Sequence, residues 1–495
     1  PGTRSTAPRV RIRPTRPAGR EADVRTRLVN LRVPVEDAGG GGPDTRPADI
    51  LIEDGRIASI TAPSERPREA DEARTDLADQ LVVPGTIDGH VHFDDPGFTH
   101  RENFETGTAS AAAGGVTCVV DMPCTSLPPV TSRANLEAKL EVIESKAHVD
   151  FMLWGGVSAN ALADPAWIRN LEDLVDEGVA AIKVYMLSGM DTFRDLSRSE
   201  IRDVLNQTRR LGIPVGVHAE DRELVREITE RLMAEGRDGP LDYAASRPAA
   251  GETRAVETLR ELCRETGARV HVVHVGSRDA LDVIVAARDE GLGLSGETCP
   301  QYLEFTEDDL AAQGALLKTA PVVKSDSDRT RLWEGVSTGA IQHVATDHAA
   351  GEWPAEKSTG SIWSDYGGIP GVELLLPYLY SEGYRRGRIG LARMTELLAA
   401  APAAFFGIES RKGRLAAGQD ADLAIIDEDA YWTVRAAEMH NLNRYTPLEG
   451  RTLAGRVTAT YVRGTCVFVR EPDGAESFGP AGYGRRVRRE TKVVT

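Results

Sequence analysis

Two histidines, His90 and His92, end an apolar segment that begins at Val83. Side chains of a strand alternate between two faces, so histidines at i and i+2 leave the same face. Two neutral imidazoles held side by side at a strand end form half of a site for zinc or a similar divalent ion. The H-x-H pattern alone is a weak indication, so we look for further donors downstream.

Four more candidate donors lie in or next to other predicted strands. Lys183 lies within an apolar run, and His218, His274 and Asp347 each stand at or near the end of one. A lone strand-end histidine is more often a packed residue than a ligand. Four histidines, a lysine and an aspartate at such positions together favour a metal centre. The remaining histidines need no metal role, and we expect His271 and His343 to be structural.

Lys183 has two interpretations. A cationic amine in an apolar strand is costly, and burial lowers its pKa. The side chain either reaches solvent or pairs with a carboxylate, or it stays neutral and reacts with carbon dioxide. The carbamate formed in the second case has two oxygens that can bridge two metal ions.

The elements that must position these residues alternate between strand and helix over residues 84–411. Strand-like runs end near His92, Met122, Ser158, Leu187, Glu220, Ser277, Leu303 and Asp347, with helical stretches at 133–147, 199–211, 253–266 and 277–290. Eight strand–helix units in one series predict an α/β fold of the (β/α)8 TIM-like barrel type rather than an open doubly wound sheet. Barrel enzymes carry their chemistry at the C-terminal strand ends, where the candidate donors fall.

Short strands with turns flank this middle region. The segments 28–83 and 412–475 predict one composite β-sandwich domain, with Asp54-Gly55 as a hairpin turn. Residues 1–27 are rich in arginine and have no apolar core, which excludes a secretory signal and favours a solvated, disordered tail over a transit-like or phosphate-binding arm. A C-terminal tail covers 476–495, and we expect its basic part, residues 485–492, to be solvated in the same way.

The composition excludes several classes of function. The chain has 495 residues and a formal charge of −17, which argues against nucleic-acid binding. It contains no apolar run long enough to cross a membrane. Five cysteines are widely spread and form no C-x-x-C pair, so reduced thiols in a cytoplasmic protein are expected.

The donor set, together with several local motifs, resembles the cyclic amidohydrolases: the allantoinases, the hydantoinases or dihydropyrimidinases, and the dihydroorotases. The motifs are the segments 104–108 (FETGT), 113–117 (AGGVT), 296–303 (GETCPQYL) and 412–422 (KGRLAAGQDAD). The resemblance covers residues 49–483 and is specific to this group.

The resemblance implies two divalent metal ions, with zinc the expected metal and carboxylated Lys183 as their bridge. His90, His92 and Asp347 would bind one ion, and His218 and His274 the other. A metal-bridging hydroxide would attack the amide carbon of a small cyclic substrate, while Asp347 acts as general base and returns the proton to the leaving nitrogen. The same machinery allows ring closure. Relatives are commonly tetramers or dimers, so a homo-oligomer is expected.

The subgroup is less clear from these motifs. Asp94 stands where dihydroorotases carry a substrate-binding arginine, which argues against that activity. Residues 95–102, which include Glu102, resemble the allantoinase loop, whereas Gln301 is typical of hydantoinases. We therefore predict an allantoinase-like hydrolase, with a hydantoinase or dihydropyrimidinase as the alternative and an inactive scaffold as the alternative of another class. Candidate substrate contacts are Tyr185, Gln301, Thr319, Ala320 and Gly368. Arg101 and Glu102 either contribute to the loop's function or only meet solvent.

Overall fold

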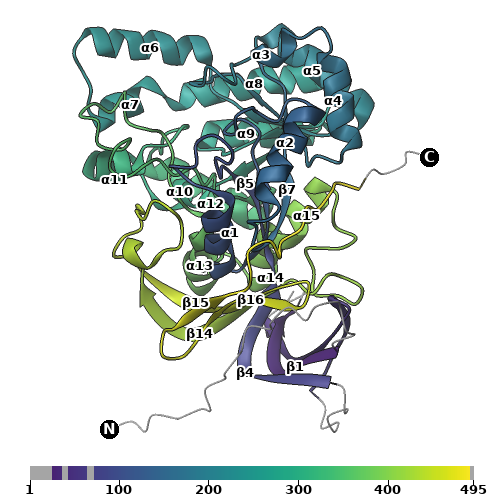
Figure 1. Cartoon of the computed structure of the whole chain (residues 1–495). Coiled ribbons are helices and arrows are strands. Elements are labelled where there is room, and N and C mark those ends of the chain that lie inside the picture. Colours follow the sequence, from purple (N-terminus) through teal and green to yellow (C-terminus); the bar gives the residue numbers. More distant parts are fainter. Residues whose placement is uncertain (1–24, 36–42, 64–71, 491–495) are drawn as a thin grey trace.

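The structure is a computed structural model that describes residues 25–35, 43–63 and 72–490. Strands from both ends of the chain form one eight-stranded sheet, in the order β17-β16-β15-β14-β4-β1-β2-β3. Figure 1 places this sheet below a body of strands and helices. The strands are β1 (Arg25–Pro34), β2 (Thr45–Glu53), β3 (Arg56–Thr61), β4 (Glu72–Pro84), β14 (Leu423–Thr433), β15 (Thr452–Val462), β16 (Thr465–Arg470) and β17 (Glu476–Phe478).

Contacts between the two ends of the chain hold this sheet together. β4 pairs in parallel with β1 and antiparallel with β14, and is thereby the link between N- and C-terminal strands. Leu28, Ile50 and Leu77 share one apolar core with Ile425 and Tyr461. The predicted hairpin is confirmed, because β2 and β3 pair antiparallel and both turn residues, Asp54 and Gly55, have positive φ as a type I′ turn requires.

The middle of the chain contains parallel strands only, in two sheets. Their orders are β5-β6-β7 and β13-β12-β11-β10-β9-β8. The strands are β5 (Thr86–Val91), β6 (Val116–Asp121), β7 (Asp150–Leu153), β8 (Gly155–Gly156), β9 (Ile182–Tyr185), β10 (Val215–His218), β11 (Val270–Val272), β12 (Leu294–Thr298) and β13 (His343–Val344). Only Trp154 separates β7 from β8, and the N–H of His92 donates to the carbonyl of His348, 2.7 Å away, beyond β13. These links connect the two sheets at both edges.

Helices alternate with these strands along the chain (Figure 1). They include α1 (Phe104–Ala113), α5 (Arg198–Leu211), α6 (Arg222–Ala234) and α7 (Pro240–Ser246). The predicted helices at 133–147, 253–266 and 277–290 are α2 (Arg133–Ile143), α8 (Ala249–Thr266) and α9 (Arg278–Asp289). α5 illustrates why they form where they do. Ser197 and Glu200 make a capping box, Ile201, Val204 and Leu205 face inward at helical spacing, and Gly212 ends the helix at φ 70°.

The two predicted tails require correction. Residues 1–24 and 491–495 lie outside the described residues, but Arg25–Arg27 begin strand β1, where the Arg27 side chain binds Glu72 at 2.8 Å. At the other end, β17 joins the sheet and Val487 is buried, its N–H donating to the carbonyl of Phe151 at 2.7 Å. The prediction of a solvated C-terminal tail is therefore wrong up to residue 490, because backbone carbonyls of the strand–helix body accept from its arginines, as Arg489 shows at Ala180 and Phe405.

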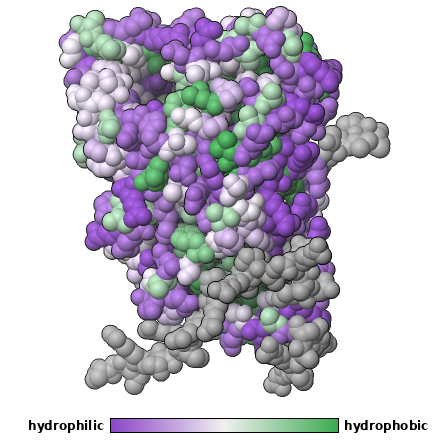
Figure 2. Space-filling view, viewed as in Figure 1, coloured by the Kyte–Doolittle hydropathy of each residue, from purple (hydrophilic) through white to green (hydrophobic). Residues whose placement is uncertain are grey.

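The surface and the cysteines agree with the composition. The face in Figure 2 is mainly hydrophilic, with hydrophobic residues in small separate groups. No helix in the described part of the chain is long and apolar enough to cross a membrane. All five cysteines are buried and unpaired.

Candidate metal centre

His90, His92 and Asp347 converge at one end of the parallel strands. The Nε2 atoms of His90 and His92 lie 3.1 and 3.2 Å from the same oxygen, Oδ1 of Asp347. The two imidazoles leave the same side of β5 and its end, with ring centroids 5.3 Å apart, as the i, i+2 spacing predicts. Burial alone would raise the pKa of Asp347, but the neighbouring His90 holds it well below its ordinary value, so the carboxylate is ionised.

His218 and His274 form a second pair of donors. Nδ1 of His218 lies 3.0 Å from Nε2 of His274, so these two nitrogens face one another. Nε2 of His218 contacts Glu220 at 2.8 Å, and Nδ1 of His90 contacts Glu297 at 2.7 Å. A carboxylate on one ring nitrogen fixes the tautomer and leaves the other nitrogen free to bind a metal. Burial lowers the pKa of His218 and His274, which favours the neutral form that metals require.

Lys183 lies on β9 and is completely buried (0% exposed). It neither reaches solvent nor pairs with a carboxylate, and its Nζ makes no hydrogen bond with any described residue. Nζ lies 4.7 Å from the centre of the Tyr185 ring. Burial lowers the pKa of Lys183, with Cys124, Asp347 and Glu297 opposing the shift. The first of the two interpretations of this lysine is therefore excluded, and an unpartnered amine of lowered pKa suits the second.

Two of the donors adopt a strained backbone. His274 has φ 45° and Asp347 has φ 52°, in the left-handed region that residues other than glycine rarely adopt. Both lie beyond their strands, since β11 ends at Val272 and β13 at Val344, so these strands are shorter than predicted. The left-handed turn directs both side chains toward the other donors.

The residues fit a pair of divalent ions. His90, His92 and Asp347 bring three donor atoms close enough to hold one ion, and His218 and His274 face one another beside them, with the His274 ring 5.5 Å from that of His90. Lys183 offers an orphaned buried amine that carboxylation would turn into a ligand. Nitrogen and carboxylate donors in this number suit zinc. His271 and His343 both contact Glu297, and their rings stack 4.9 Å apart. With Glu297 they are close enough to hold an ion themselves, so their structural role stays a prediction.

A cavity of about 610 Å³ opens onto this donor set. Four of the five predicted substrate contacts line it, namely Tyr185, Thr319, Ala320 and Gly368. The backbone of Gly368 is already engaged, because its N–H donates to the carbonyl of Lys318 at 2.9 Å and its carbonyl accepts from Lys357 at 2.6 Å. Gly368 therefore shapes the wall and offers the substrate no free N–H.

Gln301 does not belong to this cavity. Its Nε2 donates to the carbonyl of Thr346 at 3.3 Å, and the side chain lines a separate space of about 20 Å³. The prediction that Gln301 contacts the substrate is wrong in this structure, because its amide is bound to the Thr346 backbone and does not line the cavity that opens onto the donors.

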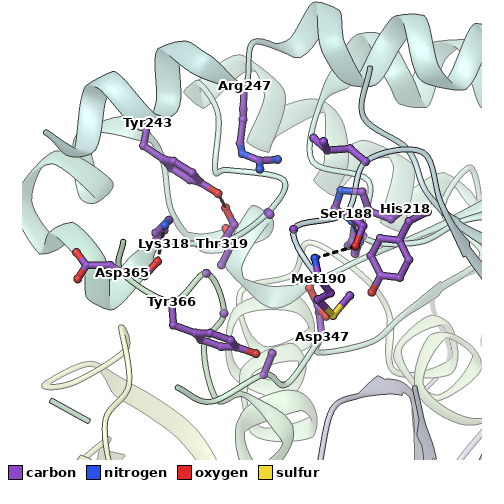
Figure 3. A pocket seen from close by; sticks show the side chains of 18 of the residues that line it. Ser188, Met190, His218, Tyr243, Arg247, Lys318, Thr319, Asp347, Asp365 and Tyr366 are labelled. Carbon is purple, nitrogen blue, oxygen red and sulfur yellow. Dashed lines mark hydrogen bonds between the residues drawn. The ribbon is translucent and has the colours of Figure 1, made fainter. Parts of the chain in front are cut away.

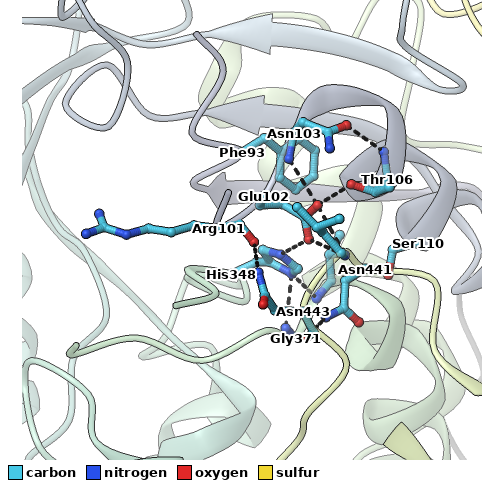
Figure 4. Close-up of polar contacts among 12 residues, drawn as sticks. Phe93, Arg101, Glu102, Asn103, Thr106, Ser110, His348, Gly371, Asn441 and Asn443 are labelled. Atoms are coloured by element: carbon cyan, nitrogen blue, oxygen red, sulfur yellow. Dashed lines mark hydrogen bonds and ion pairs between the residues drawn. The ribbon is translucent and has the colours of Figure 1, made fainter. Parts of the chain in front are cut away.

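Glu102 and Arg101 do not simply meet solvent. Glu102 is fully buried and accepts from the backbone N–H groups of Asn103 at 3.0 Å and Leu442 at 3.2 Å, with His348 Nε2 at 3.3 Å (Figure 4). His348 follows Asp347 directly, so Glu102 holds in place the segment beyond β13 that carries this donor. Arg101 makes a bidentate contact with Glu356 and stacks on Tyr366, 4.4 Å from the ring centre.

We expect Glu102→Ala to lower the free energy of unfolding by about 3 kcal/mol, because it leaves several buried donors without an acceptor. Urea unfolding of the purified protein measures the change. Glu105→Ala is the matched control, since Glu105 is exposed in the first turn of α1 and its replacement should cost no more than about 0.5 kcal/mol. Equal effects of the two substitutions would show that Glu102 does not hold the segment around His348.

Residues 81–467 match the Amidohydrolase family. The chain belongs to this family. Among amidohydrolase relatives, the allantoinase of Rubrobacter xylanophilus is 37% identical over 445 residues, which cover 90% of this chain and 95% of the relative. The L-hydantoinase of Paenarthrobacter aurescens is 34% identical over 447 residues, covering 89% and 94%. The solved structure of L-hydantoinase (dihydropyrimidinase) from Arthrobacter aurescens superimposes with a TM-score of 0.86 at 31% identity, covering 94% of this chain and 99% of that one.

Several residues of this amidohydrolase site escaped the sequence analysis. Glu220 contacts and orients His218, and Glu297 contacts and orients His90. The sequence showed both glutamates but not which histidines they contact. The sequence did contain a signal for these glutamates. Burying a carboxylate in or next to an apolar strand costs free energy, as burying Lys183 does, so such a carboxylate is expected to have a partner. Lys318 carried no comparable signal, because its place in the cavity depends on contacts distant in sequence.

Proposed function

We propose that this protein is a metal-dependent hydrolase that opens a cyclic amide or ureide ring, allantoinase-like in its choice of substrate. The observation that carries the proposal is the convergence of five donors around a buried amine that makes no hydrogen bond with any residue in the described ranges. The inactive scaffold, the alternative of another class, would not need such a set. The allantoinase relatives, at 35–37% identity over most of the chain, support the allantoinase-like choice.

Two zinc ions, bridged by carboxylated Lys183, are the proposed cofactors. His90, His92 and Asp347 would hold one and His218 and His274 the other, and together the ions would supply a polarised carbonyl and a water of lowered pKa. Asp347 takes the proton of the attacking water and delivers it to the ring nitrogen that leaves. Glu297 and Glu220 keep His90 and His218 in the tautomer that this requires.

The surrounding fold is proposed to be a closed (β/α)8 barrel. The strand order β5 to β13, the one-residue step from β7 to β8 and the His92–His348 hydrogen bond support closure. The shared core of the terminal strands supports a β-sandwich as the companion domain, built from the predicted segments 28–83 and 412–475 with β17 added. The cytoplasmic location and the homo-oligomer, dimer or tetramer, stay predictions.

A panel of rings tests the proposed substrate. With the zinc-loaded protein we expect opening of allantoin at a kcat/KM at least tenfold above that for hydantoin, dihydrouracil or succinimide, measured by the appearance of the carboxylate product. The second candidate, a hydantoinase, is favoured by the solved L-hydantoinase neighbour and predicts the reverse order. No turnover of any of the four rings would contradict both.

A further inference from the structure

The cavity extends well beyond the donor set. A five- or six-membered ring displaces only a few water volumes of about 30 Å³ each. The space of about 610 Å³ has the size that takes a larger ligand. Figure 3 places Lys318, Tyr243 and Asp365 across this space from His218 and Asp347. A ring held near the donors would direct a substituent toward that far wall.

Lys318 is a cationic group of the far wall. The residue is 5% exposed and lines the cavity. Its Nζ donates to the backbone carbonyl of Asp365 and lies 4.7 Å from the centre of the Tyr243 ring. In the described part of the chain no carboxylate lies within ion-pair distance of this ammonium. An ammonium has three N–H donors, so Lys318 can donate further.

The nearby carboxylates are committed elsewhere. Oδ1 of Asp365 accepts from the N–H of Thr359 at 2.8 Å and from its hydroxyl at 2.9 Å. Glu220 pairs with Arg247 and also contacts His218. Arg247 thus has a direct ion-pair partner, whereas Lys318 has none among the described residues and feels the Asp365 carboxylate only at longer range.

A second lysine adds positive charge behind the same wall. Lys357 is buried, and its Nζ donates to the carbonyls of Tyr366 at 2.9 Å and Gly368 at 2.6 Å. Like Lys318, it has only carbonyl partners within hydrogen-bond or ion-pair distance among the described residues. Burial lowers the pKa of Lys357 to about 7, so this amine is only about half charged at neutral pH and Lys318 carries most of the positive charge of the far wall. A buried cation without an ion-pair partner favours an anionic ligand.

We propose that the far wall recognises a carboxylate on the substituent of the ring, with Lys318 as its counter-ion. This inference rests on the proposed ring-opening function and names its substrate class: cyclic amides that carry an acidic side chain some bonds away from the ring. Burial lowers the pKa of Lys318 to about 8, so most of the amine is charged at neutral pH. A charge-assisted hydrogen bond in such a place is stronger than one between neutral groups.

Matched pairs of substrates test the proposal. The probes are hydantoins with carboxymethyl, carboxyethyl and carboxypropyl groups at carbon 5, each beside its neutral carbamoyl analogue. We expect the acid of at least one pair to be opened with a kcat/KM about ten- to a hundredfold above that of its amide, the range for a charged hydrogen bond. Lys318→Gln should reduce this ratio at least tenfold, mainly through KM, since glutamine still donates to the Asp365 carbonyl but carries no charge. Lys318→Arg should keep the preference.

Calorimetric binding of the same pairs to the zinc-loaded protein separates this inference from the proposed function. If no ring is opened, the function fails, and tighter binding of the acid that is lost in Lys318→Gln still supports the recognition site. If the amides are opened as well as the acids, or if Lys318→Gln keeps the acid preference, the function stands and the inference is overturned. Absence of a binding difference at all three lengths would overturn it in the same way.

Discussion

Replacing Lys183 by alanine is expected to abolish ring opening and to lower the metal content from about two ions per chain to one or none. The amine lies buried without a partner among the donors, so carboxylation is the way in which it can contribute oxygens to both ions. Metal analysis of the purified variant measures the loss, and a carbamate signal in ¹³C NMR after exposure to labelled carbon dioxide should be present in the wild type and absent in the variant. A fully active Lys183→Ala protein would refute the carbamate proposal.

A second buried lysine provides the matched control for stability. Lys412 is also fully buried, but its Nζ binds Asp150 at 2.8 Å and Asp422 at 2.5 Å. Lys412→Met removes the buried cation that Asp422 pairs with and leaves Arg463 as the cation paired with Asp150, so it should cost about 3–5 kcal/mol. Lys183→Met removes an unpaired amine and should not lower the stability of the metal-free protein. Comparable destabilisation by both would show that Lys183 has a structural partner.

Replacing Asp347 by asparagine is expected to reduce kcat by a factor of about 10²–10⁴, the range for loss of a general base, with the fold retained. The amide has nearly the shape of the carboxylate but accepts no proton from water and binds a metal more weakly. Asp347 Oδ1 contacts both His90 and His92, so the variant should also hold its first ion less tightly.

Metal titration separates the two roles of Asp347. We expect Asp347→Asn to remain slow when excess zinc restores full occupancy, because the proton acceptor is still missing. Recovery of wild-type turnover at saturating zinc would show that Asp347 acts only as a metal ligand and not as the general base. Normal turnover without added metal would contradict both roles.

Most of the donor set could be predicted from the sequence, because each donor lies in a recognisable local pattern. A histidine pair at i, i+2 must leave one face of a strand, and a lysine in an apolar run must be buried, whatever the distant contacts are. In the structure, the Nε2 atoms of His90 and His92 both contact Oδ1 of Asp347. Lys183 is buried, and its Nζ has no hydrogen-bond partner among the described residues. The alternation of strand and helix similarly predicted the parallel order of the central strands.

Features that depend on distant partners were not predictable in the same way. The basic segment near Val487 reads as solvated, but backbone carbonyls 80 or more residues away accept from its arginines, as the Arg489–Phe405 hydrogen bond shows. Glu102 has its partners at His348 and Leu442, over 200 residues further on. The residues that line the cavity also depend on contacts between distant parts of the chain. For this reason Gln301 was wrongly predicted to contact the substrate, and Lys318 was not predicted to line the cavity.

Anomalous diffraction from crystals of the zinc-loaded protein, recorded at the zinc edge, tests the central claim most directly. The account predicts two peaks, one among His90, His92 and Asp347 and one between His218 and His274, with additional density on Lys183 Nζ that reaches both. A single peak elsewhere, or two peaks with an unmodified Lys183, would contradict it.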